Sequence, residues 1–231
     1  MTAPVVADPG LVERISSRRD ELQRRISERT DADVRIVCVT KAHPPEVAAA
    51  AIAAGFTLLG ENYAQELRDK AAALSEQVAG AGASWHFIGR LQTNKVRLIS
   101  DVVGLWQSVD RASLAEQIAR RAPEGQRVLV QLDLAGLEGR GGCPPAEAPD
   151  LVDRCRDLGL DVRGLMGVGP PGEPEDARAG FRLLARMADD LGLEERSMGM
   201  SADLEVAVEE GATLVRVGSA LVGPRPGNVI R

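Results

Sequence analysis

The sequence predicts an α/β fold: a single (β/α)8 barrel of the TIM type with an additional N-terminal helix. Eight short runs rich in Val, Ile and Leu alternate along the chain with segments of helical periodicity. Strict alternation of strand and helix implies parallel strands, because the chain must cross back over the sheet between them. A chain of 231 residues has room for eight such units. A doubly wound open sheet is the alternative, which the number of strands disfavours.

A helix is expected at residues 8–29, ahead of the first strand. Leu11, Ile15, Leu22 and Ile26 recur there at near-helical spacing among arginines and glutamates. A cluster of four arginines is interleaved with acidic residues, which indicates a solvated helix face and not a nucleic-acid patch. This helix would complete the outer ring of a barrel.

The first strand is expected at 34–40, a run rich in β-branched residues that is typical of a buried strand. The later strands are expected at 56–59, 85–88, 102–109, 127–134, 162–168, 197–200 and 213–217. An alanine-rich helix begins at Pro44 and Pro45 and ends at Gly55, because proline favours a helix start and glycine the position after its end. Further helices are expected at 63–79, 111–122, 146–158, 174–191 and 203–210.

We expect a single domain over residues 1–231, since no linker rich in proline and serine divides the chain. It would consist of an N-terminal helix at 1–33, the barrel at 34–223 and a tail at 224–231. The chain has 28 basic and 34 acidic residues, a formal net charge of −6. That balance argues against a general nucleic-acid binder, which carries a basic surface.

Other classes of protein are excluded by the same reasoning. The longest uncharged apolar run, 47–60, is too short to span a bilayer. The N-terminus lacks a basic start and a signal-peptide core, so we expect a cytoplasmic protein. Cys38, Cys143 and Cys155 form neither an even framework nor a CxxC pair, so neither a disulfide scaffold nor a metal site is expected.

Lys41 is the first candidate for chemistry. In a barrel of this type the site lies at the C-terminal ends of the strands, and Lys41 directly follows the first of them. Burial against an apolar strand lowers the pKa of an amine and frees its lone pair to attack a carbonyl. The alternative is that Lys41 extends to solvent or pairs with Glu61. Glu61 either orients a neighbour or faces water, and its position alone does not decide between these.

The loops after the last two strands form the second candidate, because in this fold they commonly hold a phosphate. Gly218 and Ser219 let backbone amides approach a phosphate closely, and Ser201 adds a hydroxyl. An ordinary N-cap of the helix that starts near Ala202 is the alternative role for Ser201. A phosphate at one end and a strand-end lysine at the other is the layout that a pyridoxal phosphate site needs.

Arg216 is the third candidate, because it lies in an otherwise apolar strand where an inward-facing guanidinium needs a partner. That partner is either a structural carboxylate or a ligand. Opposite a pyridine nitrogen, Arg216 can only donate a hydrogen bond, since arginine does not give up its proton. The ring would then stay unprotonated and be a poor electron sink, which suits holding the cofactor better than driving carbanion chemistry.

The remaining motifs are weaker. Residues 167–172 match a dinucleotide-binding glycine spacing, but Pro170 and Pro171 remove two amide donors, so we interpret the segment as a turn. The two histidines are far apart in the sequence. We expect His43 near the mouth of the barrel and His86 as a hydrogen-bonded residue of the core.

Six motifs follow one another along the chain: VTK at 39–41, GENY at 60–63, WHFIGRLQTNK at 85–95, RGLM at 163–166, SMGMSAD at 197–203 and VRVG at 215–218. Together they resemble the pyridoxal phosphate homeostasis protein family, over about residues 34–223 and in the family's order. The resemblance implies a barrel like the N-terminal domain of alanine racemase, which agrees with the strands found independently.

The resemblance also implies the cofactor, pyridoxal 5′-phosphate (PLP), and its binding residues: Lys41 (covalent Schiff base), Asn62, Ser201, Arg216, Gly218 and Ser219. The lysine would hold the aldehyde carbon, the serines and glycine the phosphate, and the arginine the pyridine nitrogen. The family binds PLP without an established reaction and is thought to buffer or deliver it. A PLP-binding homeostasis protein is therefore expected, monomeric, with PLP-dependent apo-enzymes as recipients.

The alternative function is a PLP-dependent amino-acid racemase of the alanine racemase type. Racemisation needs a base on each face of the substrate, and racemases of this fold add a β-domain. Tyr63 is the only tyrosine available as a second base, so we expect a carrier and not an enzyme. Two features depart from the family: His43 stands where a second lysine is frequent, and 133–142 has Arg140 as its only basic residue. A barrel that has lost its ligand is a third reading, which the lysine, serine and arginine do not require.

Overall fold

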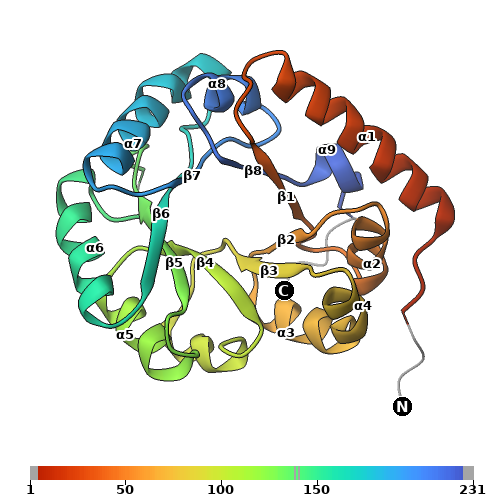
Figure 1. The fold of residues 1–231 in the computed structure, drawn as a ribbon, viewed down its shortest axis with the longest axis horizontal. Helices are drawn as coiled ribbons and strands as arrows, with labels where there is room; N and C mark the ends of the chain where they lie inside the picture. Colours follow the sequence, from red (N-terminus) through yellow and green to blue (C-terminus); the bar gives the residue numbers. More distant parts are fainter. Residues whose placement is uncertain (1–4, 138, 140, 226–231) are drawn as a thin grey trace.

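Eight parallel strands close into a barrel, in the order β1 to β8 around the ring (Figure 1). The computed structural model describes residues 5–137, 139 and 141–225. The predicted TIM-type barrel is confirmed, and the open sheet is wrong because β1 pairs with β8 as well as with β2. The strands are β1 (Arg35–Val39), β2 (Leu58–Glu61), β3 (Ser84–Phe87), β4 (Val103–Val109), β5 (Arg127–Leu132), β6 (Asp161–Gly167), β7 (Glu195–Ser197) and β8 (Leu214–Val217).

Helices surround the barrel as an outer ring (Figure 1). The α-helices are α1 (Pro9–Ser27), α2 (Pro45–Ala53), α3 (Ala64–Ala73), α4 (Ser75–Gly80), α5 (Ala112–Arg121), α6 (Ala148–Asp157), α7 (Arg178–Asp190), α8 (Leu204–Glu209) and α9 (Ser219–Val222). The 3-10 helices are η1 (Thr93–Leu98), η2 (Pro145–Glu147) and η3 (Pro174–Ala177). The leading helix α1 packs against α2 and α9 and so closes the ring where the first and last units meet.

Two strands lie about two residues from their predicted positions. The second strand was expected at 56–59, but Phe56 belongs to the turn after α2, where its backbone N–H donates to the carbonyl of Ala51. The seventh was expected at 197–200, but Gly199 has a φ of +90°, which a strand does not adopt. The second strand thus starts two residues later than expected and the seventh starts two residues earlier, at the polar Glu195.

The predicted helix at 63–79 is two helices, because Leu74 leaves the helical conformation and turns the chain between α3 and α4. The connection from β3 to β4 contains the 3-10 helix η1 in place of an α-helix. Of the predicted tail at 224–231, Pro224 and Arg225 are described and the remainder lies outside the described residues.

The core has two parts. The larger lies between the strands and the surrounding helices, and the smaller fills the barrel interior with Val37, Leu105, Leu129, Met166 and Leu214. The inner group comes from β1, β4, β5, β6 and β8. Among the described helices, none is both long and apolar enough to cross a membrane.

Candidate functional site

Lys41 lies two residues beyond the end of β1, at the C-terminal end of the barrel, and is half-buried. Burial lowers the pKa of its amine, and the positive charges of Arg225 and Arg216 lower it further, while Glu61 opposes them. The next residue, Ala42, has a φ of +59°, an uncommon conformation for a residue other than glycine. The chain therefore makes a tight turn just after the strand, in which the His43 N–H donates to the carbonyl of Thr40 at 3.2 Å.

Glu61 does not pair with Lys41. It is fully buried and forms an ion pair with Lys70 of α3, with 2.6 Å between Nζ and Oε1. The Thr40 hydroxyl donates to the same carboxylate oxygen at 2.6 Å. Burial raises the pKa of the Glu61 carboxyl, and Lys70 acts in the opposite direction. The alternative in which Glu61 neutralises Lys41 is therefore wrong, and Glu61 instead orients its neighbours.

Arg216 points into a buried part of the barrel and does not have a structural carboxylate as its partner. One guanidinium nitrogen donates to Ser197 Oγ and another to the carbonyl of Gly167, each at 2.7 Å. Burial lowers the pKa of Arg216 to about 10, and the charge of Asp203 opposes this effect without an ion pair between the two. The guanidinium thus stays charged near neutral pH, with neutral partners.

The predicted phosphate segments lie at the ends of β7 and β8. Ser201 and Ser219 are exposed there, and Gly218 immediately precedes α9. Ser201 does not cap α8, because Asp203 holds the N-cap position and its carboxylate accepts from the Met200 amide at 2.6 Å. The N-cap alternative for Ser201 is therefore wrong, which leaves its hydroxyl at the surface of the mouth.

Gly218 also lies against the first strand. A Cβ added there would lie 3.3 Å from the carbonyl oxygen of Val39, so the last loop passes close to the strand that carries Lys41. Since β7, β8, β1 and β2 are consecutive around the ring, the predicted site residues come from neighbouring strand ends. The barrel therefore brings together residues that are up to 178 positions apart between Lys41 and Ser219.

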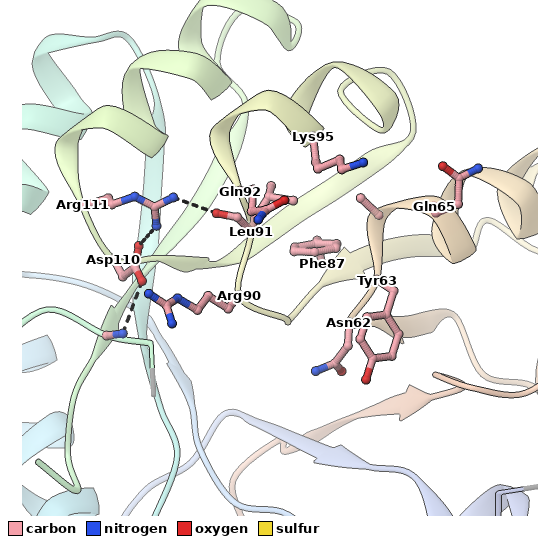
Figure 2. A pocket seen from close by; sticks show the side chains of 12 residues that line it. Asn62, Tyr63, Gln65, Phe87, Arg90, Leu91, Gln92, Lys95, Asp110 and Arg111 are labelled. Atoms are coloured by element: carbon pink, nitrogen blue, oxygen red, sulfur yellow. Dashed lines mark hydrogen bonds and ion pairs between the residues drawn. The ribbon is translucent and has the colours of Figure 1, made fainter. Parts of the chain in front are cut away.

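Asn62 follows β2 and borders a cavity of about 890 Å³. Figure 2 shows Asn62 and Tyr63 on one side of it and the ion-paired Asp110 and Arg111 on the other. The Asn62 Oδ1 atom is buried without a hydrogen-bond partner. Of the six predicted binding residues only Asn62 lines this cavity, so the cavity adjoins the predicted cofactor site without coinciding with it.

The two histidines lie as expected. His43 is in the loop after β1 at the mouth, where burial and the nearby charge of Lys70 lower its pKa. His86 is buried inside the barrel, with Nδ1 2.9 Å from Nε2 of Gln107, and burial lowers its pKa to about 3. Of the segment 167–172, where a turn is expected, Gly167 is the last residue of β6 and the remainder is irregular, with a bend at 171–172 ahead of η3. Arg140 lies outside the described residues.

Sequence reasoning missed Lys70, Gln107 and Ser197. All three side chains are buried and polar. Lys70 donates to the carbonyl of Thr40, next to Lys41, and Ser197 accepts from Arg216. Gln107 is reached through Ser197, whose hydroxyl donates to it. Signals for them existed: Lys70 lies on the apolar stripe of its helix with Leu67 and Ala71, and Gln107 interrupts an apolar strand.

Comparisons by family model, by sequence and by structure all point to the same group of proteins. A family model for the N-terminal domain of alanine racemase matches residues 17–226. The pyridoxal phosphate homeostasis protein of Aquifex aeolicus is 38% identical over 226 residues, which cover 92% of this chain and 97% of that protein. The corresponding protein of Deinococcus radiodurans is 44% identical over 196 residues, 84% and 90% of the two chains. The structure of PipY from Synechococcus elongatus with PLP bound superposes with a TM-score of 0.77, at 32% identity, over 90% of this chain and all of that one.

Proposed function

The chain belongs to the pyridoxal phosphate homeostasis protein family, and from that premise we propose that it binds PLP through Lys41 and buffers or delivers it. The observation that carries the proposal is the state of Lys41. It is a half-buried amine with a lowered pKa at the mouth of the barrel, close enough to Arg216 for the two charges to interact. An amine in that state reacts with an aldehyde more readily than a solvated lysine.

The residues around Lys41 fit the cofactor. PLP supplies an aldehyde that condenses with an amine and a ring that can accept electrons. The buried, unpartnered Asn62 Oδ1 marks a place where a polar group of a ligand would complete the hydrogen bonding. The exposed hydroxyl of Ser201 and the amides of Gly218 and Ser219, which open α9, suit a phosphate, since first-turn amides have no intrahelical partner.

Arg216 is the residue that would face the pyridine nitrogen of bound PLP, to which it would donate a hydrogen bond. Because its guanidinium stays charged, it has no tendency to protonate that nitrogen. A ring held in this way withdraws electrons weakly, which supports a carrier without catalytic turnover. Racemisation would need a second base, and Tyr63, the only tyrosine, is 58% exposed on the rim of the neighbouring cavity.

The compartment and partners follow from the same proposal. We expect the protein to act in the cytoplasm as a monomer and to pass PLP to PLP-dependent apo-enzymes. The three cysteines are free and buried in the barrel, which fits a reducing compartment. His43 at the mouth occupies the place where the family often has a second lysine, so delivery here would proceed without an amine at that position.

The lysine content makes the test direct, because the sequence holds only three lysines: Lys41, Lys70 and Lys95. The protein is mixed with PLP, reduced with borohydride and digested, and the peptides are weighed. We expect one phosphopyridoxyl group, on Lys41, together with an absorbance band that Lys41→Ala abolishes.

Lys95→Ala is the matched control, since Lys95 is exposed and lines only the neighbouring cavity. An unchanged band in Lys41→Ala overturns the lysine assignment, and enzymatic D/L interconversion of an amino acid overturns the carrier role.

A further inference from the structure

A single chain of hydrogen bonds crosses the barrel interior and ends at Arg216. The Arg216 guanidinium donates to Ser197 Oγ at 2.7 Å, and Ser197 Oγ donates to Gln107 Oε1 at 2.6 Å. Gln107 Nε2 then lies 2.9 Å from His86 Nδ1. All four side chains are buried, and they come from β8, β7, β4 and β3, so the chain joins strands on different sides of the ring.

The chemistry of the four groups allows only one direction of donation. Arginine is a donor without an acceptor, so Ser197 must accept from Arg216 and give its own hydrogen to Gln107 Oε1. Gln107 is thereby oriented with its amide nitrogen toward His86, whose Nδ1 must accept. The reversed amide would leave the Ser197 hydroxyl hydrogen without an acceptor in a buried site, which is unfavourable.

This direction fixes the state of His86 as neutral, with its proton on Nε2. The surroundings of the imidazole agree. Burial is the main cause of its lowered pKa, followed by the positive charges of Arg127 on β5 and Arg35 on β1. His86 lines a cavity of about 540 Å³ at the opposite end of the barrel, where Asp161 and Glu195 also lie. These two carboxylates do not reverse the effect of the arginines and of burial.

The guanidinium of Arg216 is held from a second direction as well. Its other terminal nitrogen donates to the Gly167 carbonyl at 2.7 Å, at the end of β6. Two fixed acceptors define the plane of the group, since the guanidinium is rigid and planar. Its remaining N–H groups then point in set directions and cannot be redirected without breaking a buried bond.

We propose that His86, Gln107 and Ser197 are positioning residues, which hold the guanidinium of Arg216 in the plane that presents an N–H to the ring nitrogen of PLP. The inference rests on the proposed cofactor site and assigns a role to three residues that do not touch the cofactor. The neutral imidazole is the terminal acceptor of the chain, and the Gly167 carbonyl is its second anchor.

The first experiment tests the chain without a cofactor. The ¹⁵N and ¹H NMR signals of the His86 imidazole in the full chain report which ring nitrogen carries the proton. We expect a neutral ring with the proton on Nε2 and no titration between mildly acidic and mildly alkaline pH. A protonated Nδ1 in that range overturns the proposal, because Gln107 would then have to turn its amide nitrogen away from His86.

The second experiment follows PLP labelled with ¹⁵N in its ring. Ser197→Ala and Gln107→Met interrupt the chain and keep the volume similar, whereas Ser197→Thr keeps the hydroxyl. Ser108→Ala is the matched control: Ser108 is a buried serine next to Gln107 whose hydroxyl donates instead to the Gly89 carbonyl at 2.6 Å. Circular dichroism and borohydride reduction first establish that each variant is folded and loaded on Lys41.

We expect Ser197→Ala and Gln107→Met to bind PLP with affinity reduced on the order of tenfold and to shift the ring-nitrogen signal. Ser197→Thr should retain the wild-type signal, and so should Ser108→Ala. If Ser197→Ala and Gln107→Met load PLP and give the same ring-nitrogen signal as the Ser108→Ala control, the positioning role is wrong. That outcome leaves the proposed PLP-binding function intact. If wild type itself fails to load PLP on Lys41, the proposed function is wrong and the positioning role falls with it.

Discussion

The ammonium group of Lys70 lies 2.7 Å from the carbonyl oxygen of Thr40, the residue directly before Lys41. The same group pairs with Glu61 Oε1, so one buried charge ties helix α3 to the ends of β1 and β2. A second carboxylate, that of Glu66 one turn earlier in α3, lies 2.7 Å away. The peptide that leads into the candidate Schiff-base lysine is therefore fixed by a charge outside the barrel interior.

Replacing Lys70 should destabilise the fold strongly. Lys70→Met removes the cation and leaves the Glu61 carboxylate buried with only the Thr40 hydroxyl as a partner, and Glu61 Oε2 already has none. Breaking a buried pair in this way costs about 3–5 kcal/mol of unfolding free energy, which urea denaturation measures. Arg68→Met is the control: the pair of Arg68 with Asp69 is exposed, and its loss should cost less than about 1 kcal/mol. Similar losses in both variants would contradict a dominant role for Lys70.

The rate at which Lys41 reacts with PLP should depend on pH, and Arg225 should help to set the pH at which the rate levels off. Only the neutral amine attacks the aldehyde, so the rate should rise with pH until it levels off above the pKa of Lys41. Since burial and nearby cations lower that pKa, the rise should be complete at a lower pH than for an ordinary lysine. Arg225→Gln removes one cation, so it should raise the pKa of Lys41 and move the curve of rate against pH to higher pH.

Stopped-flow absorbance measures this rate. Arg97→Gln is the control, because Arg97 is another exposed arginine. An unmoved curve in Arg225→Gln would show that Arg225 does not contribute to the lowered pKa of Lys41, which leaves burial and Arg216 as its causes.

Gly89 should not tolerate a side chain. A Cβ there would lie 2.2 Å from the carbonyl oxygen of Asn62 and 2.7 Å from its Cα, so Gly89→Ala must push Asn62 aside. We expect about 1–3 kcal/mol lower stability, as for other overpacked sites, together with weaker PLP binding. Gly80→Ala is the control, because nothing lies within 4 Å of its Cβ position in α4 and alanine favours a helix by about 0.5–1 kcal/mol. Wild-type PLP affinity in Gly89→Ala would remove Asn62 from the binding site.

The thiols should be unreactive in the native protein. Burial is the main cause that raises the pKa of Cys38 and Cys155 to about 12 and that of Cys143 to about 11. Because the thiolate is the reactive form, a disulfide reagent at neutral pH should label none of them in the folded state and all three in urea. Fast labelling of one cysteine in the native protein would reveal local opening, for which Cys143 is the first candidate, since it follows the loop after β5.

The fold was predictable from the order of apolar runs, because strands such as β1 and β5 are buried on both faces and leave a continuous signal in the sequence. What the pattern could not supply was the exact register. Phe56 is as apolar as any strand residue, yet it packs in the turn after α2, and the polar Glu61 completes β2. The backbone conformation of Gly199, which ends the seventh strand early, leaves no hydrophobic trace.

The candidate site was predictable where a residue was anomalous by itself. Lys41 at a strand end and Arg216 within an apolar strand carry that kind of signal. Lys70, Gln107 and Ser197 gain their roles from partners on other strands and helices, at sequence separations from 9 residues for Lys70 and Glu61 to 90 for Ser197 and Gln107. The pairing of Ser197 with Gln107 forms only when distant strands come together, so no local window of sequence contains it. The pair of Lys70 with Glu61 is close in sequence, but the periodicity of α3 alone does not show that the lysine is buried.

Closure of the barrel also has a consequence for synthesis on the ribosome. The ring is completed by pairing β8 with β1, which joins Val217 to Cys38 across nearly the whole chain, and β8 carries Arg216. Contacts at such separations form late, because the entropy of closing a long loop opposes them. The nascent protein can expose Lys41 early but gains the opposing wall of its site only after the last strand has emerged. If Lys41 and Arg216 form the proposed site, a chain that ends before β8 should therefore lack half of it and bind PLP weakly.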